Sequence, residues 1–193
     1  MLDFEQKHID AWINYQNIKH NSAKQRIEKL SLMKYSGSEK SLLDLGANQG
    51  HFGMYLADHF KEIICLEPVI ERPNYLKKNM RWIKDSFGKF TDYNLKKFDV
   101  VFSFAMTMQV KEFDGLNEDC IAERHFNLVD NGGVMIYESQ KLEERKENLK
   151  HVSGMVEGFR KYFGKEIENG SARTAGGRLY FVFMKNMQTP KTY

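Results

Sequence analysis

A glycine-bearing loop followed by an acidic residue is the part of this sequence with the clearest capacity for chemistry. Residues 42–50 read LLDLGANQG, a short apolar run that passes into two glycines. Glycine lets a backbone turn tightly and approach a bound molecule where a Cβ would collide. Glu67 ends the next apolar run, 17 residues after Gly50. An acidic side chain in that place can accept two hydrogen bonds from the hydroxyl groups of a ribose.

The elements that would position these residues alternate between strands and helices. Short apolar runs predict strands over residues 41–45, 63–66, 81–84, 98–104, 134–137 and 179–184. Apolar spacing of three and four residues predicts helices over residues 3–33, with a break at Asn21-Ser22, and over 52–60, 115–129 and 141–163. Residues 36–38 are expected to form a turn and residues 169–177 a loop. This alternation predicts a parallel sheet covered by helices on both faces, with ligands bound beyond the carboxyl ends of its strands.

Composition narrows the class of protein. The 193 residues predict one domain, and a formal charge of +3 is too small to indicate an extended nucleic-acid surface. Hydrophobic residues make up 41% of the chain, which excludes general disorder. Cys65 and Cys120 stand far apart, so neither a disulfide scaffold nor a thiolate zinc site is expected. The chain has no apolar run of about 18 residues and no signal-peptide pattern, so we expect a cytoplasmic protein without a membrane partner.

Four motifs together carry a resemblance to a known family. Residues 42–50 resemble motif I of the class I S-adenosylmethionine-dependent methyltransferases, and residues 63–67 resemble the acidic second motif of that family. Residues 98–103, FDVVFS, are similar to the fourth motif, and residues 128–134, LVDNGGV, to the L-x-P-G-G turn before the fifth strand. The motifs occur in the family's order and, with the terminal strand, cover most of the chain.

The resemblance implies a Rossmann-like α/β fold. Its sheet would have seven strands, mostly parallel with the last strand antiparallel, and helices on both faces. The chain would be a single methyltransferase domain over residues 1–193. Within it, residues 1–38 would form an N-terminal helical cap, residues 39–185 the core, and residues 186–193 a flexible tail.

The resemblance also implies S-adenosyl-L-methionine as the methyl donor and S-adenosyl-L-homocysteine as the product. Asp44 and Gly46 would shape the pocket for the methionine part, Gly50 would open the helix beneath the cofactor, and Glu67 would hold the ribose. The other residues expected at the cofactor are Ala47, Asn48, Pro68 or Val69, Asp85, Ser86 or Phe87, Ser103 and Phe104. Asn48 replaces the middle glycine of motif I, and asparagine tolerates left-handed backbone angles better than most residues.

The segment after the predicted fourth strand limits the chemistry. Residues 103–106, SFAM, lack the Asp/Asn-Pro-Pro-Tyr/Phe sequence used to methylate amide or exocyclic nitrogens, and they lack carboxylates for magnesium. A metal-independent transfer to an oxygen or nitrogen is therefore expected. Glu138 and His125 are the candidate general bases. Glu138 could instead cap the next helix, and His125 could instead be a packing histidine.

Three residues are candidates for contact with the methyl acceptor. Gln109 could orient a hydroxyl group, and Tyr15, in the N-terminal helices beside Trp12, could reach an acceptor with its polar tip. Arg173, together with Arg178, could bind an anionic acceptor such as a phosphate or a carboxylate. The same arginines could equally be surface charges.

The sequence favours a small-molecule O-methyltransferase, with a saccharide or phosphorylated acceptor. One alternative is an RNA or protein methyltransferase. A basic stretch would then contact the phosphates of the substrate, and it consists of Lys77, Lys78, Arg81 and Lys84. A second alternative is a non-catalytic subunit that binds S-adenosylmethionine. The identity of the acceptor and the oligomeric state stay open.

Overall fold

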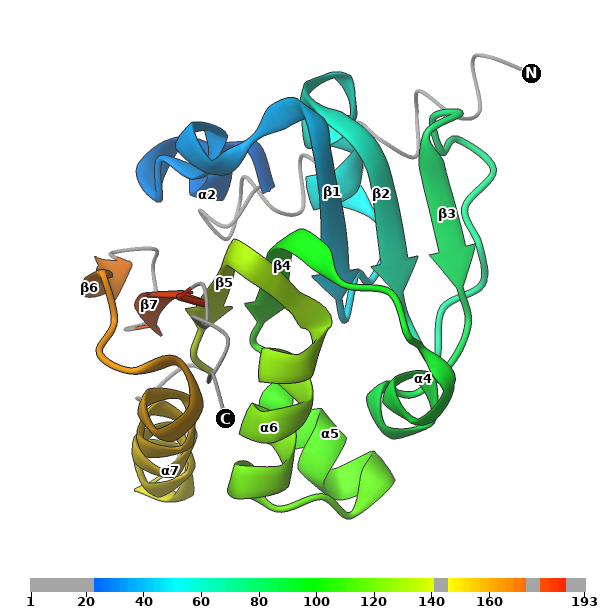
Figure 1. Cartoon of the computed structure of the whole chain (residues 1–193). Coiled ribbons are helices and arrows are strands. Elements are labelled where there is room, and N and C mark those ends of the chain that lie inside the picture. Colours follow the sequence, from blue (N-terminus) through cyan, green and yellow to red (C-terminus); the bar gives the residue numbers. More distant parts are fainter. Residues whose placement is uncertain (1–22, 141–145, 173–177, 187–193) are drawn as a thin grey trace, which may run out of the picture.

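The computed structural model describes residues 23–140, 146–172 and 178–186. Seven strands form one sheet in the order β3-β2-β1-β4-β5-β7-β6 (Figure 1). The strands are β1 (Gly37–Leu45), β2 (Phe60–Leu66), β3 (Met80–Ile83), β4 (Phe98–Phe104), β5 (Val129–Glu138), β6 (Glu168–Ala172) and β7 (Arg178–Met184). Strands β3, β2, β1, β4 and β5 run parallel, and β7 pairs antiparallel with both β5 and β6. The expected seven-stranded, mostly parallel sheet is confirmed.

Helices cover both faces of the sheet, as predicted. The α-helices are α2 (Ala23–Lys29), α3 (His51–Leu56), α4 (Phe87–Tyr93), α5 (Thr107–Asp114), α6 (Glu118–Leu128) and α7 (Lys146–Phe163), and the 3₁₀ helices are η1 (Leu32–Tyr35) and η2 (Ala57–His59). Figure 1 shows α4, α5, α6 and α7 together below the sheet and α2 above it. Among the described helices, none is long and apolar enough to cross a membrane.

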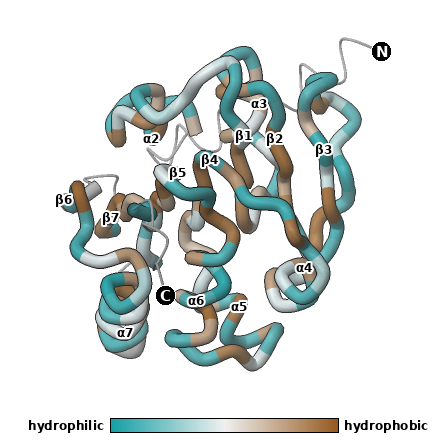
Figure 2. The backbone as a smooth tube through the Cα atoms, viewed as in Figure 1, coloured by the Kyte–Doolittle hydropathy of each residue, from teal (hydrophilic) through white to brown (hydrophobic). Residues whose placement is uncertain are grey.

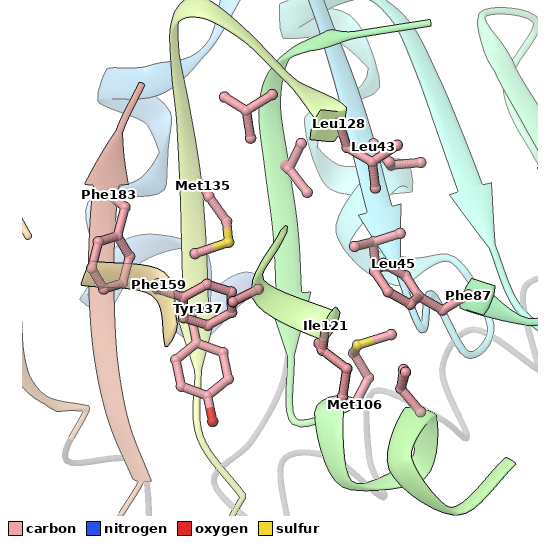
Figure 3. Packing of buried hydrophobic residues seen from close by; sticks show 14 of the residues in the cluster. Leu43, Leu45, Phe87, Met106, Ile121, Leu128, Met135, Tyr137, Phe159 and Phe183 are labelled. Carbon is pink, nitrogen blue, oxygen red and sulfur yellow. The ribbon is translucent and has the colours of Figure 1, made fainter. Parts of the chain in front are cut away.

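The apolar core lies in two layers, one on each face of the sheet. Successive residues of a strand point to opposite faces, so Leu42 joins one cluster with α2 and α3, and Leu43 joins the other with α4 to α7. Brown, the hydrophobic end of the colour scale, lies along parts of β1, β2 and β3 in Figure 2. In the second cluster, Phe159 of α7 lies against Tyr137 of β5, with ring centroids 5.2 Å apart (Figure 3).

The expectations for two local segments were wrong, and two short helices were not predicted. Residues 169–172, expected in a loop, belong to the edge strand β6. This strand pairs with β7, and Gly170 lies opposite Tyr180. The segment reads ENGSA and has little intrinsic strand preference, so its pairing with β7 decides its structure. Residues 37 and 38, expected in a turn, begin β1. Helices α4 and α5 were not predicted, since their short apolar patterns are weak.

The N-terminal cap is described only from residue 23. Helix α2 packs Ile27 into the core, and Ser31 follows in a left-handed conformation with φ 49° before η1 begins. The chain therefore turns sharply here instead of continuing as one helix to residue 33. The expected break at Asn21-Ser22 and the side chain of Trp12 lie outside the described residues.

The two glycines before the apolar part of β5 provide a test of the fold. Gly132 has φ 78°, and no described atom lies within 4 Å of the Cβ that an alanine would add there. A Cβ on Gly133, in contrast, would lie 2.9 Å from the carbonyl oxygen of Asp99. We expect Gly132→Ala to lower the free energy of unfolding by about 1 kcal/mol through backbone strain. Gly133→Ala is expected to cost about 3 kcal/mol, because backbone atoms must move. Urea unfolding of both variants measures this, and an equal or reversed order contradicts it.

Candidate active site

The carboxyl ends of β1, β2 and β4 open onto one cavity of about 360 Å³. Strand order reverses here, because β2 lies on one side of β1 and β4 on the other. Ligands of doubly wound sheets bind in the crevice that such a reversal creates. The cavity is lined by the loops that follow these strands, by α2 and α5, and by the first residue of β7. Residues distant in sequence therefore share one surface.

Three residues of the loop after β1 have positive φ angles, which is the left-handed backbone conformation. Gly46 has φ 70°, and a Cβ there would lie 2.9 Å from the Cβ of Met106. Asn48 has φ 53°, so asparagine does adopt the left-handed conformation that the sequence required of it. Gly50, with φ 76°, is the N-cap of α3 and does not itself line the cavity. Gly46, Ala47 and Asn48 do line it.

Glu67 joins the loops after β1 and β2. Its Oε2 accepts a hydrogen bond of 2.9 Å from the backbone N–H of Asn48. Its Oε1 accepts from the backbone N–H groups of Val69 and Ile70, at 2.9 and 3.3 Å. The side chain is buried and lines the cavity with Pro68 and Val69. A carboxylate offers about four lone-pair sites, so Glu67 holds the loops and can still accept a bond from a ligand.

Asp44 is the unusual carboxyl group of the cavity. It lines the cavity and is buried, and among the described residues its Oδ2 has no hydrogen-bond partner. Burial raises the pKa of Asp44 to about 7, although the charge of Arg26 acts to lower it. A buried polar atom without a partner is costly. This oxygen is therefore available to a cationic or hydrogen-bonding group of a ligand.

The loop after β3 contributes Ser86 and Phe87 but not Asp85. Ser86 and Phe87 line the cavity. The Oδ1 of Asp85 accepts from the backbone N–H of Ser86 at 2.9 Å, and its Oδ2 accepts from the hydroxyl of Tyr93 at 3.2 Å. Asp85 thus holds this loop in place through these two hydrogen bonds. Its expected contact with the cofactor is not seen in the cavity lining.

Ser103 and His125 form a buried pair away from the cavity, which corrects the role expected of each. The Nε2 of His125 lies 3.0 Å from the hydroxyl oxygen of Ser103, and its Nδ1 lies 2.7 Å from the carbonyl oxygen of Ile121. Both residues are fully buried, and neither lines the cavity. The ring of His125 stacks on Phe87, with centroids 4.7 Å apart. With both nitrogens engaged, His125 is a packing histidine and not a general base.

Glu138 is held by two arginines, and this corrects its expected role as a base. Arg26 donates from Nε and Nη2 to the two carboxylate oxygens, at 3.0 and 2.6 Å. Arg178 donates from Nη1 to Oε1 at 3.0 Å. The Glu138 side chain has no exposed surface, while both arginines line the cavity. Both carboxylate oxygens are therefore occupied by guanidinium donors, so Glu138 anchors two arginines and does not face an acceptor.

The remaining predicted contacts divide between the cavity and segments that are not described. Phe104 and Gln109 line the cavity, and the amide of Gln109 is hydrogen-bonded to that of Gln140 at 2.8 Å. Tyr15 and Arg173 lie outside the described residues. Within the described ranges, no three His, Cys, Asp or Glu side chains gather as a group that could hold a metal ion.

Several cavity residues were not predicted from the sequence. Arg26 enters from α2, with its guanidinium 4.7 Å from the ring centroid of Phe52 and 5.1 Å from that of Phe104. Helix α5 contributes Val110 and Phe113. The sequence signal for Arg26 is slight: a basic residue directly precedes Ile27 on the apolar stripe of the predicted helix. Such placement is common on solvated helices, so it carries little information alone.

Comparisons with known proteins identify the fold. No protein-family model matches the sequence, and no curated protein matches it. The N-methyltransferase NodS from Bradyrhizobium japonicum WM9 is similar with a TM-score of 0.67 and 14% identity, over 85% of this chain and 96% of NodS. Its complex with S-adenosyl-L-homocysteine gives 0.61 and 15%, over 84% and 88%. A TehB-like SAM-dependent methyltransferase from Corynebacterium glutamicum gives 0.64 and 14%, over 96% and 100%.

The chain therefore has the fold of class I S-adenosylmethionine-dependent methyltransferases, as the four motifs indicated. The [4+2]-cyclase SpnF is also similar, with a TM-score of 0.62 and 10% identity, over 84% of this chain and 81% of SpnF. One fold thus carries different reactions, and the reaction must be argued from the site.

The buried environment of His125 predicts a pH dependence of stability. Burial lowers the pKa of His125 to about 4, below the ordinary value of 6.5. As the pH falls, the imidazole of His125 is protonated in the unfolded chain before it is protonated in the folded chain. The contribution of neutral, buried His125 to the free energy of unfolding is therefore complete above pH 6.5 and is lost towards pH 4. The loss is about 3 kcal/mol at pH 4. We expect His125→Gln to flatten this decline in urea unfolding at a series of pH values. An NMR titration of folded wild type with a His125 pKa near 6.5 would contradict the assignment.

Proposed function

We propose that this protein is a metal-independent, S-adenosylmethionine-dependent methyltransferase acting on an oxygen of a small molecule. The observation that carries the proposal is the buried Oδ2 of Asp44, which has no hydrogen-bond partner within the described ranges and shares a cavity with the carboxylate of Glu67. S-adenosylmethionine has an ammonium group at one end and a ribose with two hydroxyl groups further along. These are the groups that two carboxylates at this sheet edge can bind.

Several residues of the cavity offer the groups that this cofactor needs. Asp44 would hold the ammonium group, and Glu67 would accept the ribose hydroxyls. Gly46 leaves room that a Cβ would fill, because that atom would lie 2.9 Å from Met106. Phe87 and Val69 line the cavity beyond Glu67 and supply an apolar surface for a base.

When bound, the cofactor supplies a methyl group on a positively charged sulfur, which reacts with a lone pair of the acceptor. The chain's residues must place that lone pair and exclude water. The aromatic rings of Phe52 and Phe104 contact the guanidinium of Arg26 and form an apolar wall of the cavity beside it. Positioning alone can lower a barrier by about 7–11 kcal/mol.

Neither predicted base is placed to take a proton from the acceptor. His125 lies outside the cavity lining, and Glu138 is paired with two arginines. An acceptor oxygen that is already ionised, as in a phosphate, would need no base. A phosphorylated small molecule, or a saccharide that carries such a group, therefore suits the site. Ser103 and Phe104 end β4 where metal-dependent relatives would need carboxylates, which supports metal-independent transfer.

Two other functions are less well supported by the described residues. An RNA or protein substrate would use the basic stretch after β2. However, Lys77 pairs with Asp58, and Lys84 pairs with Glu71, so half of the stretch is already neutralised. A subunit that binds the cofactor without turnover would share the same cavity. Turnover on any acceptor separates that function from an enzyme.

Loss of Glu67 tests the proposed cofactor site. We expect wild type to bind S-adenosyl-L-homocysteine and Glu67→Ala to bind it about 10- to 150-fold more weakly, equal to about 1.5–3 kcal/mol. The variant loses the acceptor for the ribose and also the link between two loops. Isothermal titration calorimetry measures both constants.

Glu166→Gln is the matched control for that measurement. Glu166 is as buried as Glu67, at 8% against 7% exposed, but it pairs with Arg160 and does not line the cavity. Its variant should bind the ligand like wild type. A folded wild type that gives no heat with S-adenosyl-L-homocysteine would sink the proposal.

The raised pKa of Asp44 predicts that cofactor binding depends on pH. Burial places this pKa at about 7, and an ammonium group beside Asp44 requires the ionised form. Binding must then displace a proton below pH 7, so affinity should fall about tenfold from pH 8 to pH 6. In Asp44→Asn the affinity should be weaker and independent of pH over this range. His51 also lines the cavity, and burial lowers its pKa to about 4, so His51 does not titrate between pH 6 and pH 8. A flat profile in wild type is the result that speaks against Asp44.

A further inference from the structure

Asp114 is a carboxylate of the cavity to which the proposed function assigns no partner. It is the last residue of α5, and it lines the cavity while staying half-buried. Its Oδ2 accepts a hydrogen bond of 3.0 Å from the backbone N–H of Gly88, near the start of α4. Its Oδ1 accepts no hydrogen bond from any residue that the structure describes. Since both oxygens of a carboxylate can accept, Oδ1 is open to a ligand.

Asp114 lies on the β3 side of the crevice. In the sheet order β3-β2-β1, Asp44 belongs to β1, Glu67 follows β2, and Ser86 follows β3. The hydrogen bond from Gly88 ties Asp114 to the end of this last loop. A ligand with its ammonium group at Asp44 and its ribose at Glu67 would therefore extend its base towards Asp114.

Asp85, the acidic residue in the loop after β3, is not available for that base. Both of its carboxylate oxygens already accept hydrogen bonds, one from the backbone N–H of Ser86 and one from the hydroxyl of Tyr93. Asp85 also does not line the cavity, whereas Asp114 does. The sequence motifs predict an acidic acceptor after β3, and the structure offers one from α5 instead.

The apolar residues near Asp114 suit a flat aromatic ring. Phe113 directly precedes Asp114, and Val69 lies in the loop after β2. Both line the cavity, although they are 66% and 65% exposed, and Phe87 lines it as well. A ring that covers these side chains removes apolar surface from water, which favours binding. A carboxylate beside such a surface then selects among rings, because the polar group that the ring brings to it must be a donor.

We propose that Asp114 selects the adenine base of the cofactor by accepting a hydrogen bond from its exocyclic amino group. The inference rests on the proposed methyltransferase function and names the residue that makes its cofactor site specific for one base. An ionised carboxylate accepts hydrogen bonds and donates none. It therefore pairs with the amino group of adenine, and it is left facing another acceptor when an oxygen replaces that amino group.

Two ligands that differ at one position of the base test this role in wild type. S-adenosyl-L-homocysteine carries the amino group, and S-inosyl-L-homocysteine carries an oxygen in its place. Isothermal titration calorimetry measures both dissociation constants. We expect the adenosyl ligand to bind about tenfold more tightly or better, because the inosyl ligand leaves the carboxylate of Asp114 without a donor.

Asp114→Asn should abolish or reverse this preference. The amide oxygen of asparagine can still accept the hydrogen bond from Gly88, and the amide nitrogen then takes the place of Oδ1. That nitrogen donates to the oxygen of the inosyl ligand and opposes the amino group of the adenosyl ligand. We expect the ratio of the two dissociation constants to change about tenfold or more in favour of the inosyl ligand.

Asp85→Asn is the matched control. It makes the same substitution in the loop after β3, and its oxygen and nitrogen can still bond to the N–H of Ser86 and the hydroxyl of Tyr93. We expect it to keep the wild-type ratio of the two constants. Thermal unfolding of both variants checks that each is folded, and the comparison of the two ligands in wild type needs no variant.

The possible failures are distinguishable. If neither ligand binds folded wild type, the proposed function fails and this inference fails with it. If the adenosyl ligand binds but wild type binds the inosyl ligand equally well, only the role of Asp114 is overturned. The same holds if Asp114→Asn keeps the wild-type ratio. If the ratio changes in Asp85→Asn instead, Asp85 reads the base and the inference is wrong.

Discussion

The reversal of strand order beside β1 is the constraint on which the site depends. Because β2 lies on one side of β1 and β4 on the other, the loops that follow these strands part and leave a crevice. Glu67 then fixes the distance between two of the loops by accepting backbone hydrogen bonds from Asn48 and Val69. The sheet and its loops therefore form the cavity.

Three buried carboxyl groups in and around this cavity differ because their partners differ. Glu67 is bound by backbone N–H groups, and Glu138 is bound by two guanidinium groups. Asp44 has an oxygen without a hydrogen-bond partner among the described residues, and burial raises its pKa to about 7. A carboxyl group therefore links two loops at Glu67, binds two arginines at Glu138, and is able to bind a ligand at Asp44. Their positions in the sequence do not distinguish these roles.

The sequence predicted those parts of the structure that local patterns control. The apolar run of β4 predicted its bounds, and the left-handed conformation at Asn48 followed from the glycine-poor form of motif I. Prediction from the sequence failed where contacts between residues far apart in the chain determine the structure. Strand β6 exists because β7 pairs with it, and its composition gives no strand signal. Nothing in the residues near Glu138 shows that Arg26, which is 112 positions away, would bind it and remove it as a base.

A crystal structure of the protein with S-adenosyl-L-homocysteine tests the central claim most directly. We expect the ligand in the crevice at the carboxyl ends of β1 and β2. Its ribose hydroxyls should donate to Glu67, and its ammonium group should lie beside Oδ2 of Asp44. A ligand that lies elsewhere, or one in the crevice that leaves both carboxylates without contact, would contradict the assignment of this cavity as the cofactor site.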